Sequence, residues 1–192
     1  MNAILFRAYL RELRPFLIAS VLIFAVGAAL GVAVASRVPG LSDQFSESIA
    51  GFLKSFRDLP KPQLAAAIFL NNSVKTFAAI LLGLGFGILP AFFLVVNGAV
   101  LGVVFYLSSH SRGVWPSLLG ILPHGVVELA AVFLGTAIGL LLGDRVFKRL
   151  TRKSAAKIEL GRALRFFAVV ILPMLLVAAL IEAFVTTALM RA

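Results

Sequence analysis

The sequence Leu122-Pro123-His124-Gly125-Val126-Val127-Glu128-Leu129 places a histidine and a glutamate inside a stretch that is otherwise apolar enough to cross a lipid bilayer. Ionisable groups are costly in the hydrocarbon of a membrane, and those that occur there tend to be functional. The composition indicates the same setting, because 61% of the 192 residues are hydrophobic, 14% are charged and the mean hydropathy is +1.05. A soluble domain of this length is rarely so apolar. The sequence therefore predicts a single integral membrane domain over residues 1–192.

Five apolar runs are long enough to cross a hydrocarbon core of about 30 Å as helices. They cover residues 16–35, 65–86, 90–107, 117–142 and 166–187. A short Gly/Pro-rich segment joins the second run to the third, which predicts a tight hairpin. Pro123 and Gly125 interrupt the fourth run near its start, and this pattern fits a short or re-entrant helix before the full span. We expect an all-α, polytopic membrane helical bundle with about five transmembrane helices.

The first run also has a second interpretation, as an export signal. Arg7, Arg11 and Arg14 precede it, and Ala33-Val34-Ala35 has the small residues of a cleavage site. Signal cores are shorter than this run, so the pattern favours a retained membrane anchor.

The distribution of basic residues predicts the orientation in the membrane. Residues 144–165 hold eight basic and two acidic residues, a net charge of +6, out of +10 for the whole chain. Lys and Arg collect in cytoplasmic loops, so we interpret 144–165 as a basic cytoplasmic loop that contacts anionic membrane lipids. Four spans separate this loop from the N-terminus, which is then cytoplasmic, and the C-terminus lies outside the cell membrane. Nucleic acid binding is the competing explanation of the charge, but no soluble binding module accompanies it.

An amphipathic segment lies between the first two spans, at about residues 42–57. Its apolar residues recur at spacings of three and four, which is typical of one helix face. They are Leu41, Phe45, Ile49, Phe52, Leu53 and Phe56. We expect an interfacial helix on the outer side of the membrane. Its apolar face either covers the bundle and the lipid head groups or docks a partner protein.

The polar residues inside the spans define the candidate site. They are Asn71, Asn72 and Lys75 in the second span, Asn97 in the third, His124 and Glu128 in the fourth, and Glu182 in the fifth. Asn71 and Lys75 are four residues apart and share a helix face, as do His124 and Glu128. Because a charged group facing lipid is expensive, we expect these side chains to turn inward and pair with one another. Such a cluster either fixes the register of the helices or forms a site for an ion, a proton or a ligand.

Metal binding and catalysis have little support in the sequence. His124 and Glu128 could supply two metal ligands, but a zinc centre normally needs three protein ligands and the chain has no Cys. No nucleophile elbow, HExxH motif or glycine-rich phosphate loop is present. We expect no metal, no cofactor and no enzymatic activity.

Small residues four positions apart predict close helix packing. They occur at Gly27 and Gly31, at Gly98 and Gly102, and at Gly135, Gly139 and Gly143. The sequence leaves open whether they join helices within one chain or join two chains, and we slightly favour a homodimer.

A second pattern is a possible inverted repeat. Gly87-Ile88-Leu89-Pro90 opens the third span, and Gly120-Ile121-Leu122-Pro123 opens the fourth from the opposite face. Such repeats often frame a binding site at the membrane midplane. A chance match in a Gly- and Leu-rich sequence is the alternative; a true repeat predicts that Asn97 and Glu128 lie close together.

Taken together, these motifs resemble the stage II sporulation protein M family of membrane proteins. The residues that carry the resemblance are Asn71-Asn72, Asn97-Gly98 and the Leu-Pro-His-Gly-x-x-Glu-Leu element at 122–129. The resemblance extends over most of the chain and implies a five-span protein. In endospore formers, it implies a membrane scaffold for peptidoglycan-degrading partners during engulfment.

Three functional classes follow from the sequence. The first is a non-enzymatic scaffold that organises other membrane or cell-envelope proteins, as the resemblance implies. The second is a small transporter or channel for an ion, a proton or a small solute, which would use the polar residues of the spans. The third is a membrane enzyme, for which the sequence suggests no substrate. We expect the scaffold, with transport as the alternative.

Overall fold

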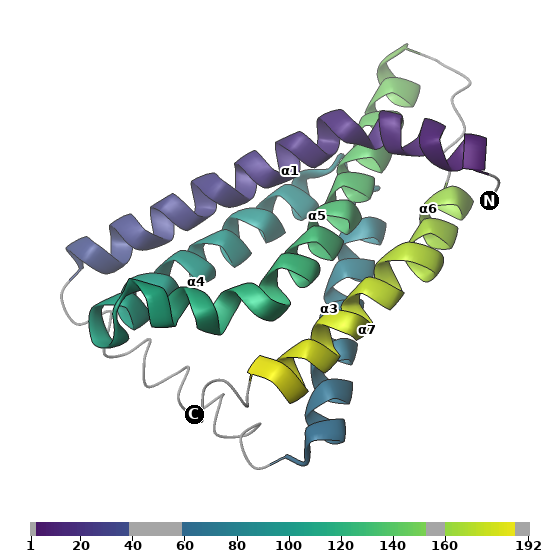
Figure 1. The fold of residues 1–192 in the computed structure, drawn as a ribbon. Coiled ribbons are helices and arrows are strands. Elements are labelled where there is room, and N and C mark those ends of the chain that lie inside the picture. Colours follow the sequence, from purple (N-terminus) through teal and green to yellow (C-terminus); the bar gives the residue numbers. More distant parts are fainter. Residues whose placement is uncertain (1–2, 39–58, 153–159, 187–192) are drawn as a thin grey trace.

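The computed structural model describes residues 3–38, 59–152 and 160–186, and within these ranges the chain is helical with short turns and no strand. Figure 1 shows long helices packed along one another as a bundle. The helices are α1 (Ala3–Arg37), α3 (Lys61–Leu82), α4 (Ile88–Arg112), α5 (Val114–Arg152) and a last helical segment made of α6 (Leu160–Phe166), η1 (Phe167–Ile171), α7 (Leu172–Leu180) and η2 (Ile181–Thr186).

Five of these helical segments are long and apolar enough to cross a membrane. They are Phe6–Arg37, Lys61–Leu82, Ile88–Arg112, Gly125–Leu150 and Leu160–Thr186. The expected all-α membrane bundle with about five spanning helices is therefore confirmed. The interfacial helix expected at 42–57, with Phe45, Ile49, Phe52 and Phe56, lies outside the described residues.

Helices α1 and α4 form the most extensive helix pair of the bundle. A methyl group at Gly27 or Gly31 would overlap the backbone of α4, and one at Gly98 or Gly102 would overlap the backbone of α1. The two glycine pairs predicted from the sequence therefore face each other within one chain. Close backbone approach of this kind provides van der Waals packing, which drives helix association where lipid removes the hydrophobic effect.

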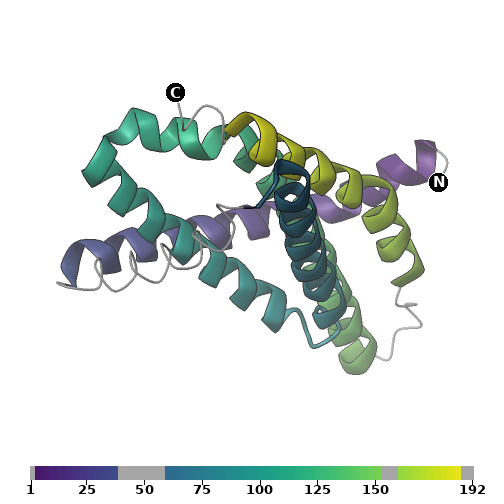
Figure 2. The same cartoon turned by 90° about the horizontal axis from the view of Figure 1, so that it is seen from below.

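Helix α5 is the central and most buried of the spanning helices, and it contacts α1, α3, α4 and the last helical segment. Its glycines continue the same mode of packing. Gly135 and Gly139 lie against α3, and Gly143 lies against the turn that follows α3. Figure 2 shows the resulting arrangement from below, with α3 beside α5 and the last helical segment, and with the α1–α4 pair on the other side of α5.

The turn between α3 and α4 is a tight hairpin. Phe86 and Gly87 have positive φ angles of 60° and 75°. The left-handed conformation is readily adopted by glycine, and it lets the chain reverse between Leu82 and Ile88 without a longer loop. The stop and restart expected from the Gly/Pro-rich segment are therefore present.

Helix α5 is longer than the sequence indicated. The expected span was 117–142, followed by a basic loop at 144–165, but residues 114–152 form one helix and helical structure resumes at Leu160. Residues 144–152 and 160–165 of the expected loop are therefore helical, and residues 153–159 lie outside the described residues. Lys and Arg are good helix formers, and an i,i+4 ion pair between Asp144 and Lys148 supports the extension.

The start of α5 runs at an angle to the rest of the helix, as its lower-left end in Figure 1 shows. Pro123 lies inside the helix and cannot donate the backbone hydrogen bond that its position requires, which explains a bend rather than a separate re-entrant helix. The Gly120–Pro123 segment is thus helical, whereas Gly87 caps α4 in the left-handed conformation. The two halves of the suggested inverted repeat therefore differ in backbone conformation.

The first and the last spanning segments also differ from the expected helices. Helix α1 begins well before the expected span at residue 16, because its first turns pack against α6: Tyr9 is buried, and the Phe6 and Phe166 rings stack with centroids 5.6 Å apart. The last segment contains two π-helical stretches, η1 and η2, on either side of α7. Pro173 near the start of α7 removes one backbone donor, and π-helical turns often occur where a regular helix is interrupted.

Candidate functional site

A cavity lies between α1, α4 and α5. It has a volume of about 230 Å³, and Asn97 of α4 and Glu128 of α5 both line it together with Phe24 of α1. The remaining lining residues are Gly125, Val100, Leu101, Val104, Leu129 and Val132. The structure thus brings together two of the polar groups that the sequence singled out, as expected if the third and fourth spans frame a common site.

Asn97 and Glu128 are both half-buried at this cavity. The side-chain Nδ2 of Asn97 donates a hydrogen bond to the Phe93 carbonyl oxygen one turn earlier, at 2.7 Å. This bond involves the amide nitrogen of Asn97 and uses one of its two donor hydrogens. The amide oxygen Oδ1 takes no part in it and is a hydrogen-bond acceptor. A carboxylate and an amide therefore both lie at this otherwise apolar wall.

The polar residues of α3 lie elsewhere. Asn71 and Lys75 are exposed, Asn72 is half-buried, and Asn71 donates a hydrogen bond to the side-chain oxygen of Asn72 at 3.2 Å. The expectation of one inward-facing cluster is wrong for Asn71 and Lys75. The buried residues of α3 are Ala65, Ser73, Thr76, Ala79 and Ile80. The backbone of α5 approaches this face closely near Ala79, where a methyl group at Gly139 would crowd the Ala79 backbone.

Two further residues of the expected cluster are separate from the cavity. Glu182 is half-buried on η2, in the last helical segment, and it does not line the cavity. His124 is part of α5, and its side chain lies outside the described structure. The predicted cluster is therefore divided among the α4–α5 cavity, the outer face of α3 and the end of the last span.

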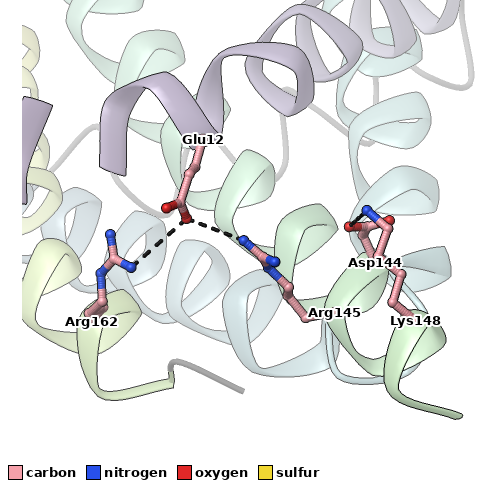
Figure 3. Close-up of polar contacts among 5 residues, drawn as sticks. All are labelled: Glu12, Asp144, Arg145, Lys148 and Arg162. Atoms are coloured by element: carbon pink, nitrogen blue, oxygen red, sulfur yellow. Dashed lines mark hydrogen bonds and ion pairs between the residues drawn. The ribbon is translucent and has the colours of Figure 1, made fainter. Parts of the chain in front are cut away.

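An ion-pair cluster that the sequence did not single out joins three helices (Figure 3). Glu12 Oε2 of α1 lies 3.4 Å from Arg145 Nη2 of α5 and 3.9 Å from Arg162 Nη1 of α6. The guanidinium of Arg162 also stacks over the Tyr9 ring, 4.6 Å from its centroid. One feature of the sequence could have indicated this cluster. Glu12 is the single acidic residue among the basic residues of the N-terminal segment.

The cluster places the start of α1 and the basic end of α5 at the same end of the bundle. This is the relationship expected if both lie on one side of the membrane. In the described residues, no group of three or more His, Asp or Glu side chains is placed to hold a metal ion.

Comparison with protein families identifies the chain. The family model of stage II sporulation protein M matches residues 20–187 of this chain, which is most of the chain's length. The chain belongs to the stage II sporulation protein M family. Comparisons with curated proteins and with solved structures found no match.

The motifs that carry the stage II sporulation protein M resemblance fall in two places in the structure. Asn97 and Glu128 line the cavity, and Gly98 next to Asn97 provides the close contact between α4 and α1. Asn71 and Asn72 lie together on the outer side of α3. The described motif residues therefore lie partly at an internal cavity and partly on the outer side of α3.

Proposed function

We propose that this protein is a non-enzymatic membrane scaffold that binds another membrane protein through the exposed face of α3. Its membership of the stage II sporulation protein M family supports an assembly role, and the sequence has none of the catalytic motifs that would suggest an enzyme. The observation that carries the proposal is the exposure of Asn71 and Lys75 on a spanning helix.

The depth of Asn71 explains why this exposure matters. Asn71 is ten residues from Lys61 and eleven from Leu82, so about 15 Å of helix lies on either side of it. A hydrocarbon core is about 30 Å thick, which puts the amide of Asn71 near its middle. The bond to Asn72 satisfies only part of its hydrogen-bonding capacity. If this face contacted lipid, the other donor and acceptor positions of the Asn71 amide would have no hydrogen-bond partner. A protein partner on this face could satisfy them.

The same face has the composition of a helix-docking surface. We define the α3 outer face by Leu70, Asn71, Val74 and Lys75, which are all exposed. Lys75 adds a positive charge one turn from Asn71. A spanning helix with a carboxylate at that level would complement Lys75, and its backbone or polar side chains could bond to Asn71. The proposed partner is therefore a membrane protein with an acidic spanning helix.

Photocrosslinking of the full-length protein in its native membrane tests this proposal. A photoreactive phenylalanine derivative at Val74 is expected to crosslink to a different membrane protein, and Asn71→Leu with Lys75→Leu is expected to reduce that product strongly. The same probe at Val169, which is similarly exposed on another helix, is the matched control. Crosslinks to lipid alone would contradict the proposal. Crosslinks only to a second copy would identify the α3 outer face as a homodimer interface instead.

Transport is the second candidate, because Asn97 and Glu128 share a cavity among the spans. If the cavity belongs to a proton or cation pathway, purified protein in liposomes is expected to support flux that Glu128→Gln abolishes. Glu182→Gln, which removes a carboxylate that does not line the cavity, is the control. Absence of flux from the wild-type protein at any pH would count against transport and leave the scaffold proposal unaffected.

A further inference from the structure

We propose that the first part of α5, residues 114–123, is a membrane-interface anchor whose exposed face binds the boundary between phospholipid head groups and acyl chains. We call these residues the anchor segment. The inference does not depend on the scaffold role. It rests on the level of the segment along the membrane normal, on the side chains that it exposes and on its attachment to α4.

The length of α5 places the anchor segment outside the hydrocarbon core. Helix α5 has 39 residues, or about 58 Å, whereas the core is about 30 Å thick. Charged residues recur from Asp144 to the end of the helix, so one edge of the core lies near Gly143. About 20 residues cross the core, which puts the other edge close to Pro123. The anchor segment begins beyond that edge.

Helix α4 gives the same level by a second count. Its start lies beside Gly143, because an added methyl group there would overlap the backbone of Gly87, the N-cap residue of α4. About 20 residues further on, α4 ends in the polar sequence Ser108–Arg112. The side-chain oxygens of Ser108 and Ser117 lie 2.7 Å apart and form a hydrogen bond. Both counts therefore put Ser117, and the anchor segment with it, at the membrane interface.

The side chains that the anchor segment exposes form one apolar face. Trp115, Leu119 and Leu122 follow one another at spacings of four and three, and they are 76%, 61% and 48% exposed. Ser117 lies on the opposite face and is buried, and its hydroxyl donates a hydrogen bond to the Gly113 carbonyl oxygen at 2.8 Å. Because Ser117 faces α4, the apolar face is turned away from the bundle.

The composition of the anchor segment favours lipid at this face. Residues 113–123 contain no charged side chain, and exposed apolar patches mark contacts with membranes or proteins. Tryptophan is enriched at membrane interfaces, where its ring lies at head-group level. Arg112 is exposed at the end of α4, three residues before Trp115, and a guanidinium at this level attracts lipid phosphates. An apolar face beside a cation matches the phospholipid boundary.

The bend in α5 lets the anchor segment stay at the interface. A straight continuation would carry its ten residues about 15 Å beyond the core and into water. Pro123 lies inside the helix, and the part before it runs at an angle to the rest of α5 (Figure 1). The segment can therefore lie along the membrane surface. Interfacial tryptophans help to set the tilt of spanning helices, so the proposed role of the anchor segment is to fix the depth and tilt of α5.

Fluorescence of Trp115 tests the proposal without any substitution, because the chain contains a single tryptophan. The full-length protein is reconstituted in vesicles of phosphatidylcholine and phosphatidylglycerol. The lipids carry a nitroxide quencher on the acyl chain, either close to the head group or near the chain end. Iodide, present on both sides of the membrane, measures exposure to water. Trp115→Phe combined with Val169→Trp is the depth control, because Val169 is exposed nine residues into the last spanning segment.

The nitroxide close to the head group is expected to quench Trp115 about twofold more strongly than the one near the chain end, since interfacial helices bury their apolar face only about 5–10 Å deep. The Val169→Trp control is expected to show the reverse order. Stronger quenching of Trp115 by the deep nitroxide would overturn the proposal, and so would strong quenching by iodide alone. Protection from iodide and from both nitroxides would also overturn it, because protein would then cover the face.

A variant pair tests whether the apolar face holds the anchor segment in place. Leu119→Gln with Leu122→Gln is expected to raise iodide quenching of Trp115 about twofold, because the face then has less apolar area to bury. Leu150→Gln, at an exposed leucine of the other end of α5, is the matched control and is expected to leave the quenching unchanged. Equal quenching in the two variants would contradict the proposal. If the double variant does not fold, the measurement on the wild-type protein decides.

Discussion

Gly98 of α4 lies directly against the backbone carbonyl of Phe24 on α1, in a contact that leaves no room for a side chain. Gly102 makes the equivalent contact with Ala28 one turn later. These contacts define the distance between the two helices and, with it, the width of the cavity that Phe24 and Asn97 line.

Gly98→Ala is expected to destabilise the protein by about 1–3 kcal/mol, because the added methyl group would force the α1 and α4 backbones apart. Thermal unfolding in detergent measures the effect. Gly161→Ala is the control, since no neighbouring atom lies within 4 Å of an added methyl group there. In helical α6, alanine at 161 is expected to be neutral or to stabilise by up to about 1 kcal/mol. Equal effects of the two substitutions would contradict the role of Gly98 in close packing.

Gly87→Ala is expected to destabilise the α3–α4 hairpin by roughly 1–2 kcal/mol from backbone strain, because Gly87 has a φ of 75°. Gly85→Ala is the matched comparison in the same turn. Gly85 is not among the residues with positive φ, and an added methyl group there would contact only the Leu82 carbonyl oxygen, at 3.4 Å. Denaturant unfolding of both variants should show the larger loss for Gly87→Ala. A smaller loss at Gly87 than at Gly85 would be inconsistent with the left-handed turn.

Glu12→Gln is expected to lower the free energy of unfolding by no more than about 1 kcal/mol at low salt. The Glu12 and Arg145 side chains are 37% and 38% exposed, so solvent screens their attraction. The difference between wild type and variant should shrink as salt is added, because the Debye length falls to about 3 Å at 1 M. Asp144→Asn, which removes the carboxylate paired with Lys148 within α5, is the control for loss of a carboxylate. A salt-independent loss would indicate that Glu12 acts through packing rather than charge.

The orientation in the membrane is tested with single cysteines, which the chain allows because it contains none of its own. Ser111→Cys at the end of α4 is expected to react with a membrane-impermeant maleimide in intact cells. Ser154→Cys, in the basic segment, is expected to react only after the cells are permeabilised, because basic segments stay in the cytoplasm. The reverse pattern of labelling would invert the proposed topology.

The sequence predicted the helical membrane fold well, because length and apolarity are properties of each span alone. The Gly87 turn was predictable for the same reason, since Gly/Pro punctuation is local. The direction that a polar side chain faces was not predictable in this way. Asn71 and Lys75 were expected to turn inward, and both are exposed, because the packing of α3 on its neighbours decides which face is buried.

The partners of the polar and small residues were equally hard to predict. The spacing of Gly98 and Gly102 predicted close packing, but only the three-dimensional arrangement shows that their neighbours are on α1. Glu12 was visible as an isolated acidic residue, yet its contacts with Arg145 and Arg162 depend on how α1, α5 and α6 meet. Asn97 and Glu128 line the same cavity, as the suggested inverted repeat predicted, although the two segments of that repeat differ in backbone conformation.

The ion pair between Glu12 and Arg162 has a consequence for biosynthesis. The two residues are 150 positions apart, and at translation rates of about 5–20 residues per second the arginine is made roughly 8–30 s after the glutamate. The earliest helix therefore reaches the membrane long before the final one exists, and its carboxylate lacks one of its two guanidinium neighbours during that interval.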